Sequence, residues 1–376
     1  MTDWNRIVRP SLIGLEPYRP GPGLEELKET YGLAEIVKLN WNEGLEGPFP
    51  GVEEAVAAEL ERAWIYPSEA YTDLRESVAA WLGTTPERIV PSHGIQALIA
   101  TVVHAFLEPG DAVVETTPTY GLYATTSAAA GARVVEVPNR DLRHDVDALA
   151  AAAREHDARL VWLCDPNNPT GSLVTRDEWE RLLAGIPERC AIVVDEAYVE
   201  YVDPEARLDR VHDVEAGRPV VLMRTFSKIF GLAGLRLGYA VVDGPLAARM
   251  DVVLEPFNVN RAALAAGRAS LLHPELVEAR RLANRAGRER LAELLRAAGA
   301  RPYPSQANFL LVDVGVDDVA LTDGLMRRGF LVRAGSEFGL HGFVRITTGP
   351  IPLMERVARE IEEVRRELLA TEAPVA

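Results

Sequence analysis

Short apolar strands alternate with helices through the middle of the chain, and this alternation constrains the fold more than any other feature. The spacing of apolar residues predicts helices at 97–106, 120–130 and 176–183. The expected strands lie at residues 112–115, 134–137, 160–164, 191–195, 220–223 and 237–242. Because these strands are apolar on both faces, we expect a parallel or mixed sheet that helices cover on both sides. The fold class is therefore α/β.

The pattern changes after about residue 256. The later elements are expected as helices at 262–272 and 274–298, strands at 309–312 and 343–346, and a closing helix at 353–369. A chain of 376 residues is too long for one ordinary hydrophobic core. We therefore expect a large domain at 46–255 and a smaller α+β domain at 256–376. Residues 1–45 would form an irregular arm and part of the smaller domain.

The formal net charge of -16 limits the classes of partner. Phosphate surfaces repel such a chain, so we expect no nucleic-acid partner and no anionic membrane as a partner. No apolar run approaches the ~20 residues of a membrane helix. Cys164 and Cys190 are the only cysteines, which excludes a disulfide framework and a cysteine-based metal cluster and indicates a reducing compartment. We expect a cytoplasmic protein without a bound metal.

Residues 224–239 carry the strongest chemical signal. Lys228 is one of only three lysines, and lysine can form an imine with a carbonyl once its amine loses its proton. The hydroxyl groups of Thr225 and Ser227 can donate to phosphate oxygens, and Arg236 can hold an anion through two parallel hydrogen bonds. A solvated surface lysine is the alternative for Lys228 alone. The whole run, with its glycines just after a buried strand, favours a binding site.

Two further motifs lie where expected strands end. Asp195 closes the strand at 191–195, and a buried carboxylate is costly unless it is paired. Residues 165–171 form a turn rich in Pro and Asn at the carboxyl edge of the sheet, where ligand sites of α/β proteins lie. The alternatives are a strand-end cap for Asp195 and an ordinary turn for 165–171. The spacing to Lys228 favours a functional role for Asp195.

Residues 224–239 resemble the lysine-binding signature of fold-type-I pyridoxal-phosphate enzymes. The resemblance is to the histidinol-phosphate aminotransferase branch, in which R-T-x-S-K-x-x-G-L-A-G-L-R-x-G is typical. It implies a three-layer large domain with a mostly parallel sheet, a smaller α+β domain, and pyridoxal 5'-phosphate as the cofactor. It assigns to Lys228 the imine with the cofactor and then the transfer of a proton. Thr225, Ser227 and Arg236 would hold the cofactor phosphate.

The same resemblance implies roles for residues around the cofactor ring. Asp195 would keep the ring nitrogen protonated, so that the ring can accept electrons. Tyr198 and Asn168 would contact the phenolic oxygen of the ring. Tyr120, in a P-T-Y-x-x-Y element, would stack on the ring face, whereas Tyr123 in that element is expected to pack in the core.

Similarity to this branch runs almost from end to end and indicates substrate-binding residues. Arg345 resembles the arginine that binds the substrate carboxylate, and Asn168 would also lie against the substrate. Tyr18 and Arg333 match positions that hold the substrate's own phosphate. Tyr66 matches a tyrosine that reaches the cofactor phosphate of the neighbouring subunit, which implies a homodimer with shared active sites. From the residues alone, packing remains open for Tyr66 and Tyr18, and a solvated position remains open for both arginines.

Two departures from the family pattern lie near the substrate side chain. The family usually reads G-N-G-S-D-E where residues 91–96 read P-S-H-G-I-Q. Gly94 and Ile95 still offer amides to the cofactor phosphate at a helix N-terminus. The ring of His93 either enters the substrate pocket or lies beside the phosphate loop. Residues 42–44 read N-E-G where N-E-N is usual, and both changes concern the choice of substrate more than the cofactor.

We expect an aminotransferase that moves an amino group between histidinol phosphate, or a related amino acid, and a 2-oxo acid such as 2-oxoglutarate. One alternative is a pyridoxal-phosphate oxidase, or another remodelling enzyme, that acts on an arginine-type amino acid. Arginine oxidases of this branch carry an acidic residue where this chain has Thr225. A second alternative is a non-catalytic binding protein, against which Lys228, Asp195 and Arg236 argue together.

Overall fold

A large, mostly parallel sheet forms the centre of the molecule. The computed structural model describes residues 2–17, 21–68 and 70–372, and within them seven strands form this sheet in the order β2-β8-β7-β6-β5-β3-β4. The strands are β2 Ile89–Ser92, β3 Ala112–Thr117, β4 Arg133–Pro138, β5 Leu160–Cys164, β6 Ala191–Asp195, β7 Val220–Thr225 and β8 Gly238–Val241. β8 is antiparallel to β2 and β7, and the other pairs are parallel. The expected sheet is therefore confirmed.

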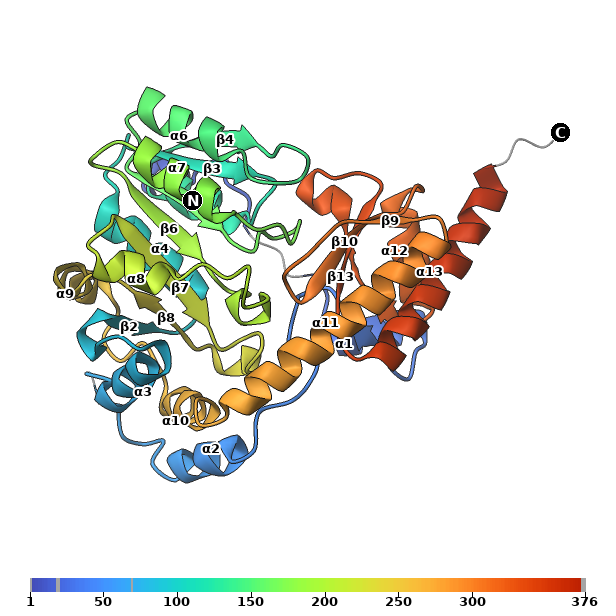
Figure 1. Ribbon diagram of the computed structural model, residues 1–376, viewed down its shortest axis with the longest axis horizontal. Helices are drawn as coiled ribbons and strands as arrows, with labels where there is room; N and C mark the ends of the chain where they lie inside the picture. Colours follow the sequence, from blue (N-terminus) through green and yellow to red (C-terminus); the bar gives the residue numbers. More distant parts are fainter. Residues whose placement is uncertain (1, 18–20, 69, 373–376) are drawn as a thin grey trace.

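Helices cover both faces of this sheet, which gives three layers (Figure 1). One face carries α6 Val146–Glu155, α7 Arg176–Gly185 and α8 Arg210–Glu215, and the other carries α4 Ile95–Phe106, α5 Leu122–Ala129 and α9 Gly244–Val253. Every residue of β5, β6 and β7 is buried, as the apolar character of these strands requires. A capping box of Thr175 and Glu178 begins α7.

A smaller antiparallel sheet lies in the C-terminal part, in the order β12-β13-β10-β9. Its strands are β9 Arg301–Pro302, β10 Phe309–Asp313, β12 Arg333–Ala334 and β13 Phe343–Thr347. The helices packed around it are α11 Pro274–Ala297, α12 Asp318–Arg327 and α13 Ile351–Glu372. β1 Val37–Lys38 pairs in parallel with β11 Phe330–Leu331. The segment that follows α1 Leu24–Tyr31 therefore joins the C-terminal part (Figure 1).

The buried apolar side chains fall into two clusters, one around each sheet. α10 Arg261–Ser270 follows the expected boundary at residue 256, yet it packs against α2 Val52–Leu60 and α3 Thr72–Leu82 in the larger cluster. α11 then runs from the region of the large sheet to the small sheet (Figure 1). We therefore propose that the smaller domain begins within α11 and not at residue 256. The large domain would then extend past residue 255, and only the bound at residue 45 stays as predicted.

The expected elements agree with the observed ones to within a few residues at most ends. The helix expected from residue 120, for example, begins at Leu122. The helices α6, α8, α9 and α12 are absent from the sequence-based expectations, although the buried residues of α6 have helical spacing. Among the described residues, no helix is both long and apolar enough to span a bilayer.

Candidate active site

A cavity of about 990 Å³ opens at the carboxyl ends of β5, β6 and β7. Loops of the large sheet, residues 41–43 of the N-terminal segment and residues 333–345 of the small sheet region contribute to its lining. Its lining includes these residues expected at the site: Ile95, Tyr120, Asn168, Asp195, Tyr198, Thr225, Ser227, Lys228, Arg236, Arg333 and Arg345. The fold thus brings together side chains that are far apart in the chain.

Lys228 lies in the turn after β7 with its amine inside the cavity. Its Nζ donates to the carbonyl oxygen of Trp41 at 2.9 Å and lies 5.6 Å from the centre of the Tyr198 ring. Burial, together with the charge of Arg345, lowers the pKa of Lys228 to about 8. A useful fraction of the amine is therefore neutral near pH 7, which is the form that attacks a carbonyl carbon.

Hydroxyl groups, a guanidinium group and a helix N-terminus form an anion cradle beside this lysine. Thr225 Oγ1 donates to Ser227 Oγ at 2.9 Å, and both side chains are buried. α4 begins after Gly94, whose φ of +96° is a conformation that glycine adopts readily. A Cβ added at Gly94 would lie 2.8 Å from Nη2 of Arg236. The backbone at Gly94 therefore lies close to the guanidinium of Arg236, so the amides at the start of α4 and this guanidinium can bind the same phosphate.

Asp195 is buried at the end of β6 and is held by two donors. Its Oδ2 accepts from Tyr123 Oη at 2.6 Å, and its Oδ1 accepts from the amide of Ala197 at 3.0 Å. Burial raises the pKa of Asp195 to about 6, although these hydrogen bonds act to lower it. Tyr123 also stacks on Trp162 at 5.1 Å, and the ring of Tyr120 meets it edge-on at 5.5 Å. Tyr123 was expected only to pack, so its role in orienting the carboxylate was missed.

Asn168, Tyr198 and Arg345 are buried side chains that line the same cavity. Arg345 donates through Nη1 to the side-chain oxygen of Asn168 and through Nη2 to the carbonyl oxygen of Asn40. The Tyr198 hydroxyl accepts from Asn42 Nδ2 at 3.1 Å. Burial raises the pKa of Tyr198, so the phenol stays protonated and can donate. The sequence marks Asn42 only as part of the altered N-E-G motif. Its contact with Tyr198 is evident only in the tertiary structure.

Arg333 and Arg345 are direct partners across β12 and β13. Both guanidinium groups lie against the ring of Phe338, at 5.8 and 5.1 Å from its centre. Arg333 also forms an ion pair of 2.7 Å with Glu337, which lines the same cavity. The sequence pattern singled out both arginines but did not indicate this carboxylate.

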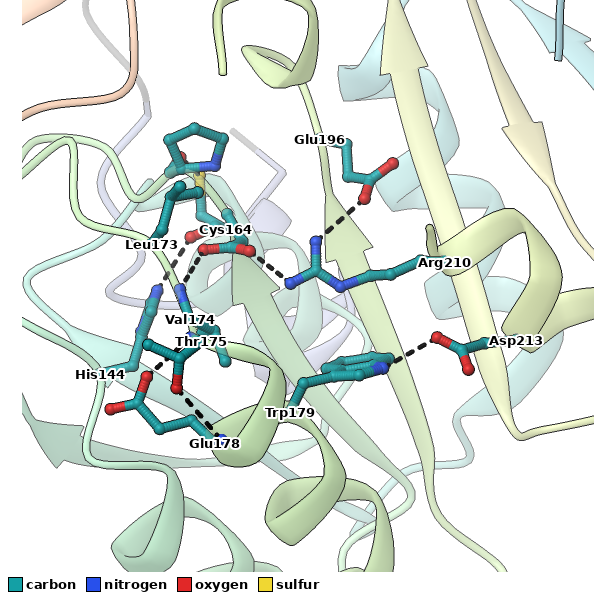
Figure 2. Close-up of polar contacts among 12 residues, drawn as sticks. His144, Cys164, Leu173, Val174, Thr175, Glu178, Trp179, Glu196, Arg210 and Asp213 are labelled. Carbon is teal, nitrogen blue, oxygen red and sulfur yellow. Dashed lines mark hydrogen bonds and ion pairs between the residues drawn. The ribbon is translucent and has the colours of Figure 1, made fainter. Parts of the chain in front are cut away.

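A buried chain of charges ties the ends of β5, β6 and β7 together, and Figure 2 shows Arg210 of this chain bonded to Glu196. Arg210 of α8 bonds to Asp165 and, at 3.0 Å, to Glu196, which also accepts from Arg224 Nε at 2.8 Å. Burial acts to raise the pKa of Glu196, but the charges of Arg224 and Arg210 hold it below its usual value. Arg210 also lies 4.7 Å above the ring of Trp179. Asp165, Glu196 and Arg224 are near neighbours in the chain of Asn168, Asp195 and Thr225, so this network fixes the strand ends that carry the site.

The N-terminal segment closes the cavity over the lysine loop. Glu43 lines the cavity and pairs with Lys38 at 2.5 Å, and Lys38 lies 3.7 Å above the ring of Trp41. A Cβ added at Gly44 would collide with the carbonyl oxygen of Lys228. This contact gives a physical reason why N-E-G stands where N-E-N is usual, because no side chain fits at the third position.

Some expected site residues lie outside the cavity lining. His93 is exposed, which agrees with the alternative of a histidine beside the phosphate loop rather than within the pocket. The side chain of Tyr66 lies on the surface, with the residue 75% exposed, and stacks on Phe257 at 4.6 Å. Gly94 contributes through its contact with Arg236. Tyr18 lies outside the described residues.

These residues fit pyridoxal 5'-phosphate. The cradle of Thr225, Ser227, Arg236 and the start of α4 suits the phosphate, and the lowered pKa of Lys228 suits its carbonyl carbon. Asp195 supplies the negative charge that a protonated ring nitrogen needs. The part of the chain that the structure describes holds no group of three or more His, Cys, Asp or Glu side chains suited to a metal ion.

Comparison with known proteins agrees with this geometry. Residues 34–361 match the family model described as aminotransferase class I and II. The histidinol-phosphate aminotransferase of Geobacillus thermodenitrificans is 39% identical over 96% of this chain and 98% of its own length. That of Halalkalibacterium halodurans is 35% identical over 97% of this chain and 99% of its own.

A solved structure is similar over the same extent. The histidinol-phosphate aminotransferase of Sinorhizobium meliloti in complex with pyridoxal-5'-phosphate superposes with a TM-score of 0.88 at 31% identity, over 96% of this chain and 98% of that one. The fold, the lysine site and these similarities agree on one family. The chain belongs to the class I and II aminotransferases of fold type I, and it is a pyridoxal-phosphate-dependent enzyme that transfers amino groups.

Proposed function

We propose that the enzyme transfers an amino group between histidinol phosphate, or a related amino acid, and a 2-oxo acid such as 2-oxoglutarate. The observation that carries the proposal is the pair Arg333 and Arg345, which are cross-strand partners and line the same cavity as Lys228. Guanidinium groups bind phosphate and carboxylate through parallel hydrogen bonds. The names of the relatives support histidinol phosphate as the amino substrate.

The residues around the cavity have different roles in transamination. Bound pyridoxal phosphate supplies a reactive carbonyl carbon and a ring that accepts electrons. Lys228 would take the proton from the α-carbon of the substrate and deliver it to the carbon that bore the carbonyl group, because an amine with a pKa of about 8 can both accept and release a proton. Asp195 keeps a negative charge at the base of the cavity, and Tyr123 and Ala197 hold its two oxygens in place.

Polar side chains that line the cavity position the substrate. Arg345 is fixed by Asn168 and by the carbonyl of Asn40, so its guanidinium can grip an anionic group without losing much rotational freedom. Arg333 and Tyr18 would hold the phosphate of the amino substrate. Tyr198 and Asn168 orient the reacting groups through their polar atoms. Water is excluded in part by the segment of Trp41 to Gly44.

A homodimer is part of the proposal. Leu60, Trp64 and Tyr66 are exposed apolar side chains close together in the chain, and exposed groups of this kind mark contact surfaces. Tyr66 would then be free to reach the cofactor phosphate of a second copy. Light scattering on the holoenzyme should give twice the mass of 41.2 kDa, and a monomeric mass would contradict the dimer.

The cytoplasm is the proposed location, and the two cysteines, which are free and buried, support it.

The proposal is tested by half-reactions without an acceptor. The holoenzyme is mixed separately with histidinol phosphate, an aromatic amino acid and arginine, while the absorption of the cofactor is followed. We expect conversion to the pyridoxamine form to be fastest with histidinol phosphate. Conversion with another amine but not with histidinol phosphate would overturn the substrate. No conversion with any amine, together with oxygen uptake, would overturn transamination itself.

A further inference from the structure

Arg333 and Arg345, which both line the cavity, bond to different kinds of group. They are cross-strand partners and share the ring of Phe338. Arg345 is held by neutral groups, the side chain of Asn168 and the carbonyl of Asn40. Arg333 is held by a full negative charge, the carboxylate of Glu337 at 2.7 Å. One cation of the substrate site therefore already has an anion beside it.

The position of Glu337 lets its carboxylate leave while the turn that bears it stays in place. Glu337 lies in the short 3-10 helix Gly335–Phe338, between β12 and β13. The amide of Ser336 donates to Asp318 at 2.7 Å, and the amide of Leu340 donates to the carbonyl of Gly335 at 2.9 Å. A Cβ added at Gly335 would lie 2.6 Å from Cβ of Phe343, so the turn is tightly packed. Only the Glu337 side chain can then move easily.

The solvent exposure of Glu337 and Arg333 also indicates that the carboxylate is the partner that can leave. The side chain of Glu337 is 46% exposed, whereas that of Arg333 is 16% exposed. The Nε atom of Arg333 is buried and has no hydrogen-bond partner within the described residues. Moving the carboxylate into water costs little, because half-exposed ion pairs are weak. Leaving the guanidinium unpaired in its more buried position costs more.

We propose that Glu337 is a specificity-determining residue that holds the anion position at Arg333 and gives it up to the phosphate of the amino substrate. This inference rests on the proposed function, because it concerns the phosphate group of that substrate. An aminotransferase must bind two different partners in one cavity. With Glu337 in place, Arg333 stays paired while a partner without a phosphate group, such as the 2-oxo acid, is bound. With the phosphate in place, Glu337 turns toward water, and like-charge repulsion sets the affinity for doubly charged groups.

The test compares Glu337→Gln with wild type, using the holoenzyme. We expect the KM for histidinol phosphate to fall about three- to tenfold, because the phosphate no longer competes with a carboxylate. Inorganic phosphate should likewise become a competitive inhibitor that is about three- to tenfold stronger. In the holoenzyme the cofactor fills its own phosphate cradle, so added phosphate reports on the substrate side. The KM for the 2-oxo acid should stay the same or rise.

The matched control is Glu289→Gln. Glu289 pairs with Arg285 at 2.9 Å with the same spacing of four residues, and it lies on α11 away from the cavity. This variant makes the same change in net charge and should leave both constants at their wild-type values. In an Arg333→Gln background, Glu337→Gln should lose its effect. A persistent effect there would assign it to general electrostatics and overturn the proposal.

The outcomes separate this inference from the proposed function. If histidinol phosphate is not converted but Glu337→Gln still strengthens inhibition by phosphate, the competition at Arg333 is supported and the proposed substrate is overturned. If histidinol phosphate is converted and Glu337→Gln behaves as Glu289→Gln does, the competition is overturned and the function stands. A rise in the KM for histidinol phosphate in Glu337→Gln would also overturn the competition. Thermal unfolding of each variant checks that the fold is intact.

Discussion

Tyr123 donates a hydrogen bond of 2.6 Å to Asp195, and the same ring stacks on Trp162. The carboxylate is thus oriented by a buried phenol that cannot turn away. Burial raises the pKa of Tyr123 well above its usual range, so it remains a donor at any working pH. The charge at the base of the cavity depends on this contact.

Tyr123→Phe should move the acid limb of the pH profile of kcat/KM to higher pH. The hydrogen bond from Tyr123 lowers the pKa of Asp195, so its loss raises that pKa above about 6 and leaves less carboxylate at a given pH. A shift of about one pH unit is expected, because a hydrogen bond to a charged group contributes about 1.5–3 kcal/mol. Tyr303→Phe, which alters a ring packed on Phe343, is the control. An unmoved limb would show that Tyr123 only packs.

The pKa of Lys228 predicts how the apo-protein captures its cofactor. The neutral amine is the reactive form, so the rate of capture should rise about tenfold per pH unit and level off above pH 8. Stopped-flow absorbance with pyridoxal phosphate measures this rate. Lys228→Arg keeps a positive charge but should show no capture, and borohydride should leave no tag on its peptide. A rate independent of pH below 8 would contradict the assignment.

Arg210→Met should strongly destabilise the protein. The change leaves the carboxylates of Asp165 and Glu196 buried with less compensation (Figure 2). Breaking a buried pair of this kind costs about 3–5 kcal/mol. Arg181→Met removes an exposed pair with Asp147 and should cost at most about 1 kcal/mol. Urea unfolding followed by circular dichroism compares the two, and equal losses would mean that the buried network adds nothing.

Gly44→Ala should impair catalysis although it adds one methyl group. Its Cβ would collide with the carbonyl oxygen of Lys228, so either the lysine turn or the N-terminal segment must shift. A displacement of about 1 Å at a reacting group can cost about a hundredfold in rate. Gly47→Ala is the control, because its Cβ would meet no atom within 4 Å. Steady-state kcat is measured for both, and a normal kcat for Gly44→Ala would contradict the close contact.

The amino-acid sequence by itself determined the α/β class, the mostly parallel sheet and the position of the lysine site. Strands such as 191–195 are apolar throughout, and Lys228 follows one of them in a run of hydroxyl and glycine residues. These are local signals, because strand burial and turn chemistry are written in consecutive residues. The roles expected for Asp195 and Arg236 rest on the resemblance of their motifs to a known family, and they stay predictions.

Only the tertiary structure decided which side chains act on these residues from a distance. Tyr123 on Asp195, Asn42 on Tyr198, Glu337 on Arg333 and Arg210 between two strands are contacts that the sequence pattern did not indicate. The placement of α10 in the large core was decided in the same way. The physical reason is that hydrogen bonds and ion pairs depend on distances of about 3 Å, and packing between separate elements sets those distances.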